Sequence, residues 1–177
     1  MASKTAYNTN NNNNNNQRDN KKTHKIDSDS VKIKIINTMP GIFNKIITRN
    51  VHEKKSMKSK FDCTSKINIS LQNYILRLVK YTNVESNTLI HTLALIDKIC
   101  TKKIYLSYKN VHKLFLVALI LSIKLLEDEI YADSHYSYAG GISIDELADI
   151  ESEFLSLIDY RVTIDDDRFM VYYDSFI

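Results

Sequence analysis

Two charged side chains, Lys124 and Glu151, stand where the surrounding pattern predicts apolar residues. Lys124 directly follows an apolar run and is itself followed by two leucines. Glu151 comes four residues after Leu147 and three before Phe154, so on a helix it lies on or beside the apolar face. A charge among apolar neighbours is costly unless it is paired or reaches water. Lys124 could reach water at a domain edge, the two residues could pair with each other, or both could border a groove that receives groups from a partner.

Other chemistry finds little support in the sequence. None of the five histidines has Cys, His or carboxylate neighbours at metal-ligand spacing, so we predict no metal site. Gly140-Gly141 lacks the further glycines and the lysine of a phosphate-binding loop, and it predicts a sharp turn instead. No nucleophile with a base, no pair of carboxylates and no cofactor loop stands out. The pattern therefore favours a binding protein without a cofactor or a small-molecule substrate over an enzyme.

The charge is divided unevenly along the chain. Residues 1–66 carry 14 Lys and Arg against 5 Asp and Glu, whereas residues 67–177 carry 10 against 16. An acidic body argues against nucleic-acid binding by the folded part, because phosphates call for a basic face. The two cysteines are too few for a disulfide framework, and no apolar run opens the chain as a signal peptide would. We therefore expect an intracellular protein of the nucleus, the cytoplasm or both.

The first 66 residues predict a tail, a short helix and a linker. Residues 1–30 contain the asparagine run Asn10 to Asn16 and too few apolar residues to offset the entropy of ordering, so we expect a disordered tail. In residues 31–66, Pro40 suits a first helical turn, and His52 to Lys66 resembles a solvated basic linker or a nuclear-import patch. One helical face there is apolar and needs a surface to cover, in this chain or in a partner: Met39, Ile42, Phe43, Ile46 and Ile47.

Residues 67–177 predict an all-α domain of five helices. The most apolar one, Asn110 to Glu129, should form the centre of the core, and its apolar run from Leu114 to Ile123 is too short to span a membrane. Ser143 opens a capping-box sequence, while Ile130 to Gly141 predicts a tyrosine-rich loop. The periodicity places the other four helices near residues 70–81, 86–100, 143–158 and 168–177.

These segments together resemble the cyclin box, and more narrowly that of the P/U-type cyclins. The central helix carries the best match, NVHKLFLVALILSIKLLED, with Lys124 at the signature lysine of the group. The loop after it keeps the length of the group and ends in GGIS, and Glu151 falls on the glutamate of its Leu-Glu pair. Further matches are KYTNVE at residues 80–85, IDYRV at residues 158–162 and a helix before the box at residues 39–50.

The resemblance implies a non-catalytic subunit that binds a cyclin-dependent protein kinase and activates it. By that likeness Lys124 and Glu151 bond to groups flanking the mobile C helix of the kinase, and four apolar residues pack on that helix: Leu121, Leu125, Phe154 and Leu155. Two departures are visible. The first box helix lacks the hydrophobic docking motif of cell-cycle cyclins, and Ala132 and Asp133 replace asparagines of the loop motif.

Two other classes of protein remain open on the sequence. One is a helical adaptor that keeps the cyclin fold without activating a kinase. The other is a transcription-associated protein of cyclin fold that touches nucleic acid, and the acidic body weighs against it. The sequence names neither the kinase nor the process that it controls.

Overall fold

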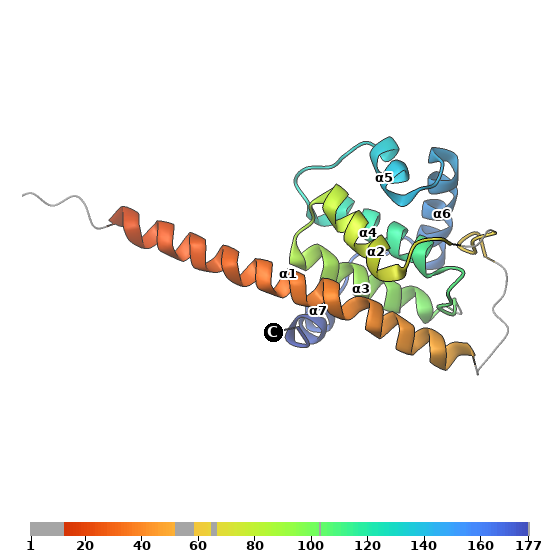
Figure 1. The fold of residues 1–177 in the computed structure, drawn as a ribbon, viewed down its shortest axis with the longest axis horizontal. Helices are drawn as coiled ribbons and strands as arrows, with labels where there is room; N and C mark the ends of the chain where they lie inside the picture. The colour runs from red at the N-terminus through yellow and green to blue at the C-terminus, as the bar shows by residue number, and fades with distance from the viewer. Residues whose placement is uncertain (1–12, 52–58, 65–66, 103, 177) are drawn as a thin grey trace, which may run out of the picture.

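The computed structural model describes residues 13–51, 59–64, 67–102 and 104–176, with side chains from residue 29 onward. All regular structure in these ranges is helical, as the sequence predicts, and no helix there combines the length and apolar character needed to cross a bilayer. Figure 1 shows the helices that follow residue 51 gathered into one domain, with the long first helix running across it. The helices are α1 (Asn13–Val51), α2 (Leu71–Thr82), α3 (Ser86–Cys100), α4 (Val111–Leu126), α5 (Asp133–Gly140), α6 (Ile144–Leu157) and α7 (Asp166–Asp174).

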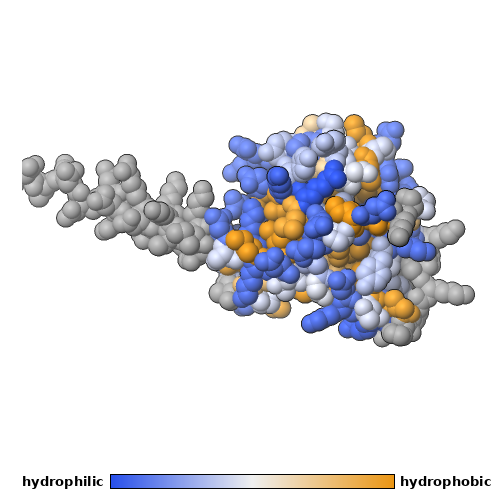
Figure 2. Space-filling model, viewed as in Figure 1, coloured by the Kyte–Doolittle hydropathy of each residue, from blue (hydrophilic) through white to orange (hydrophobic). Residues whose placement is uncertain are grey.

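Helix α4 is the centre of the domain. Every residue from Leu114 to Ile123 is buried, and the helix contacts α2, α3, α5 and α6. Helix α3 lies between α4 on one side and α1 and α7 on the other. The face shown in Figure 2 is mostly hydrophilic with scattered apolar patches, as expected when the apolar helix is enclosed. The prediction of a central apolar helix surrounded by amphipathic ones is confirmed.

Local sequence signals set several helix ends. The side chain of Ser70 accepts a hydrogen bond from the amide of Asn73, and Ser143 accepts one from the amide of Glu146. Asn110 precedes α4 as expected but makes no such cap. The side chain of Asn110 instead accepts a hydrogen bond from the amide of Ser107 and donates one to the carbonyl of Tyr105. These two bonds fix the turn that leads into α4.

The apolar stripe predicted before the box is docked on the domain. Met39, Phe43 and Ile47 are buried, and the ring of Phe43 meets that of Phe115 on α4 edge to face, with centroids 6.1 Å apart. Ile42 and Ile46 are partly buried against the same core. This chain therefore supplies the surface that the stripe covers, which is one of the two alternatives left open by the sequence.

Helix α1 is longer than the sequence predicts. It begins at Asn13, so residues 13–30, expected to be disordered, are helical in the structure, and Pro40 lies inside the helix rather than in its first turn. No glycine or proline interrupts residues 13–38, and extending an existing helix costs less than nucleating one. Figure 1 shows this first half projecting away from the domain. Residues 1–12 of the expected tail lie outside the described residues, and the division at residues 30 and 66 stays a prediction.

Part of the expected solvated linker is packed. Phe61 is fully buried, and its ring meets that of Phe154 edge to face at 6.1 Å. The ammonium of Lys113 donates to the backbone carbonyls of Lys60 and Asp62, both at 3.3 Å. The expectation of a solvated segment is therefore wrong for residues 59–64, because one aromatic residue among the charges has a core site to fill. The lysines of residues 52–58 lie outside the described residues.

A short helix replaces the loop predicted over Ile130 to Gly141. Helix α5 has only two turns, too few for a clear period, which explains why the pattern did not indicate it. Its Tyr136 is fully buried, and the phenol oxygen accepts a hydrogen bond from the amide of Tyr131 at 3.0 Å. Gly141 ends the helix with φ of 71°, a left-handed conformation that favours glycine. The glycine pair does form a sharp turn, as predicted.

Gly41 within α1 and Gly140 at the end of α5 should respond oppositely to substitution. A Cβ at Gly140 would clash with the buried methyl groups of Leu116. We therefore expect Gly140→Ala to lower the free energy of unfolding by about 1–3 kcal/mol. Gly41 has open space around its Cβ position within α1, so Gly41→Ala should raise stability by about 0.5–1 kcal/mol. Urea denaturation measures both changes. Equal effects of the two substitutions would contradict the packing of α5 on α4.

Candidate functional site

Lys124 lies in the last turn of α4 and forms ion pairs with two other helices. Its ammonium lies 2.8 and 3.1 Å from the two carboxylate oxygens of Glu151 on α6. It also lies 3.2 Å from a carboxylate oxygen of Asp133, the first residue of α5. The site thus joins the last turn of α4, the start of α5 and the middle of α6 through one cation. Pairing of Lys124 with Glu151 is what one of the sequence hypotheses required.

The same three side chains remain open to solvent. The exposed fractions are 31% for the side chain of Lys124, 16% for Glu151 and 55% for Asp133. Partial burial by itself lowers the pKa of Lys124, but the hydrogen bonds and charges of Glu151 and Asp133 outweigh it, so that the pKa is raised above its ordinary value. The lysine is therefore charged at physiological pH. Pairing within the chain and presentation at the edge of the domain occur together.

Leucines on the same two helices flank the charged group. Leu125 follows Lys124 and is 44% exposed, and Leu155 lies one turn after Glu151 and is partly buried. Leu121, one turn before Lys124, is 5% exposed and contributes little surface. An exposed apolar area around a paired charge has the composition of a protein interface, with an apolar centre and specific polar bonds.

Phe154 does not belong to this surface. The sequence placed it beside Leu155 as a contact residue, yet its ring is fully buried against Phe61. Neighbouring residues on a helix point about 100° apart, so α6 can present only one of the two to a partner, and Phe154 takes the core side. We therefore remove Phe154 from the candidate interface and keep it as the residue that supports α6 from behind.

The structure adds two residues to the site. Asp133 at the start of α5 forms an ion pair with Lys124. Spacing along the sequence could not show this contact, because α5 itself was not predicted. Tyr160 is 70% exposed and lies beside Leu155, since its amide donates to the Leu155 carbonyl at 2.8 Å. Its φ is 57°, in the left-handed region that a tyrosine rarely adopts. Asp159 before it has φ of 54°, and the two left-handed residues end α6 and leave the Tyr160 ring exposed.

The charges of the site are paired with one another within the chain. The carboxylates of Asp133 and Glu151 both form ion pairs with the ammonium of Lys124. No group of three His, Cys, Asp or Glu side chains within the described ranges is placed to hold a metal ion. The ammonium and the carboxylates also remain partly open to solvent.

Comparison with known proteins identifies the family. The family model described as "Cyclin" matches residues 1–162. The chain is 25% identical over 157 residues to Cyclin-U2-1 of Arabidopsis thaliana, a match covering 85% of this chain and 70% of that one. It is 24% identical over 192 aligned positions to PHO85 cyclin-7 of Saccharomyces cerevisiae, with 85% and 67% covered. It is also 33% identical over 97 residues to PHO85 cyclin PHO80 of the same yeast, with 54% and 33% covered. The chain belongs to the cyclin family and is of the P/U type.

Proposed function

We propose that this cyclin is the regulatory, non-catalytic subunit of a cyclin-dependent protein kinase and that it activates this kinase. The observation that carries the proposal is the Lys124 and Glu151 pair, which is held at the solvent edge of the box beside exposed leucine side chains. Two of the relatives are PHO85 cyclins, which supports a kinase partner for this chain. Such a partner implies a location inside the cell, in the nucleus, the cytoplasm or both.

The proposed contact surface consists of one charged group with an apolar surround. Lys124 and Glu151 would bond the backbone that flanks the C helix of the kinase, while Leu125 and Leu155 would pack on its apolar side, with Leu121 at the base of the surface. Apolar packing would supply most of the affinity, and the charged pair would fix the register, because a misplaced helix leaves desolvated charges without partners.

The proposed mechanism of activation is a population shift. A protein kinase is active only when its catalytic lysine and the glutamate of its C helix are paired and its activation segment is open. A subunit that binds this arrangement alone favours it by the difference between its affinities for the two states. Raising the active population from about 1% to about 99% needs a difference of about 10⁴-fold and increases activity about 100-fold.

The test is reconstitution with individual kinases. Purified full-length chain is mixed with each of a panel of cyclin-dependent kinases, and phosphorylation of a generic peptide is measured beside each kinase alone. We expect no activity from the cyclin alone and roughly 100-fold activation of at least one kinase. If the chain binds one of these kinases but changes the activity of none, it does not activate them. The alternative of a helical adaptor would then be favoured.

A further inference from the structure

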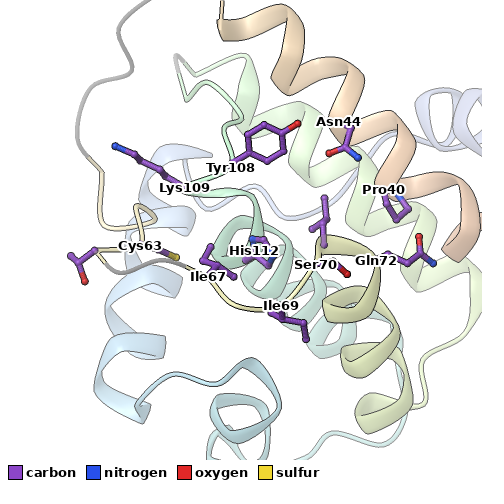
Figure 3. Close-up of a pocket in the computed structure, with 12 residues that line it drawn as sticks. Pro40, Asn44, Cys63, Ile67, Ile69, Ser70, Gln72, Tyr108, Lys109 and His112 are labelled. Atoms are coloured by element: carbon purple, nitrogen blue, oxygen red, sulfur yellow. The ribbon is translucent and has the colours of Figure 1, made fainter.

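A second site lies at the opposite end of α4 from Lys124. A cavity of about 890 Å³ is enclosed by α1, by the chain leading into α2 and by the start of α4. Figure 3 shows His112 at its centre, with Pro40 and Asn44 of α1 on one side and Cys63 on the other. His112 precedes Lys124 on the same helix by about 18 Å along the axis. The cavity is therefore separate from the proposed kinase surface.

The imidazole of His112 is a buried polar group without a partner. The residue is 8% exposed, and neither ring nitrogen has a hydrogen bond of acceptable geometry within the described part of the chain. Burial lowers the pKa of His112, an effect that the backbone of Ile69 opposes only in part. The neutral ring then has one nitrogen that can donate and one that can accept. A buried polar group left in this state costs free energy, which a ligand with matching groups would recover.

The rest of the lining supplies donors and lacks acidic groups. Helix α2 begins here, and the amides of Leu71 and Gln72 lie in its first turn, where an α-helix leaves amides without partners of its own. Ser70 satisfies only the amide of Asn73. No Asp or Glu stands in this first turn, and Lys109 at the outer edge is the one charged residue of the lining.

We propose that this cavity binds a small oxyanion, a phosphate or carboxylate group, between the first turn of α2 and the ring of His112. First-turn amides and the positive end of the helix dipole attract negative charge, and the donor nitrogen of His112 adds a bond from α4. A ligand there would bridge α2 and α4 beside α1, so its binding would stabilise the attachment of all three elements.

The decisive substitution is Gln72→Glu. A carboxylate in the first turn suits the helix dipole, so the folded chain should melt no lower than the wild type, while the added charge repels an oxyanion. The matched control is Asn87→Glu, which places the same charge in the first turn of α3, at an exposed position outside the cavity. His112→Leu removes both ring nitrogens and tests the proposed contribution of His112 to anion binding.

Calorimetric titration of the full chain with inorganic phosphate and, separately, with acetate gives the readout, with sodium chloride keeping ionic strength constant. We expect saturable binding of at least one anion, weakened about tenfold or more by Gln72→Glu and by His112→Leu and unchanged by Asn87→Glu. The anion that binds more tightly shows whether the cavity prefers a phosphate or a carboxylate group. Absence of saturable binding for both anions, or equal weakening by the two glutamate substitutions, overturns the proposal.

Discussion

Lys124→Ala and Glu151→Ala should each weaken kinase binding by roughly 2–5 kcal/mol, because groups of the kinase are left buried without partners. The same substitutions should change the free energy of unfolding by about 1 kcal/mol or less, since the pair is partly solvated in the free subunit. Lys124→Ala should cost more stability than Glu151→Ala. It leaves Glu151, the less exposed partner, without a cation, whereas Lys124 without Glu151 keeps Asp133.

The exchange of both charges separates an internal role from an interface role. If the pair only joins α4 to α6, Lys124→Glu combined with Glu151→Lys should restore folding and function. The exchanged glutamate would, however, face Asp133, so the exchange must also be made with Asp133→Asn. At a kinase interface the exchange fails to restore affinity even in that background, because the groups of the kinase keep their original polarity.

The measurement is calorimetric affinity for the kinase beside thermal melts of each variant. Asp149→Ala serves as a matched control, since this residue also forms an ion pair from α6, with Lys60, but precedes Glu151 by two positions and therefore points elsewhere. Loss of stability with unchanged affinity per folded molecule would return Lys124 and Glu151 to a structural role.

The sequence predicts the helices of the box better than it predicts their connections. The starts of α2 and α6 follow from Ser70 and Ser143, whose side chains satisfy amides only at a helix start. Helix α4 follows from an apolar run too long for a strand. Helix α5 and the packing of Phe61 could not be predicted in the same way. Each depends on a single buried aromatic residue that fills a space between other helices. The hydrophobic periodicity of the sequence does not show where such spaces lie.

The charged site was predictable in its position but not in its geometry. A lysine and a glutamate on apolar faces indicated a special role, and the structure brings them within 2.8 Å. Whether two such residues meet depends on how α4 and α6 cross, which sequence spacing does not give. Phe154 was misassigned. The helical period places Phe154 on the apolar face with Leu147, and only the family resemblance made it a contact residue; in the structure it faces the core.

Replacing the docked stripe of α1 should have the largest effect on stability. Met39, Phe43 and Ile47 are at most 1% exposed, and single alanine substitutions at such sites cost about 2–5 kcal/mol each. Their sum approaches or exceeds the 5–15 kcal/mol that stabilises a typical domain, so the triple alanine variant should be largely unfolded at 25 °C. The kinase should then be neither bound nor activated.

Deletion of residues 1–30 should have no such effect. Among the residues with described side chains, the buried ones of α1 begin at Ile35, so the truncated chain keeps all of these. It should melt like the full chain and activate the kinase equally. The matched control for the triple variant replaces three exposed residues of the same helix, Asn37, Lys45 and Thr48, with alanine, which does not lower helix propensity and removes no buried side chain.

Circular dichroism and urea denaturation distinguish the two ways in which α1 could be attached. If α1 is part of one cooperative core through Phe43 and Phe115, then Phe43→Ala alone should shift the whole unfolding transition. If α1 is an appendage, the box should unfold at an unchanged midpoint while only helical signal is lost. An unchanged midpoint for Phe43→Ala would therefore contradict the inclusion of α1 in the core. We expect the midpoint to fall, because the ring contacts the central helix around which the domain is built.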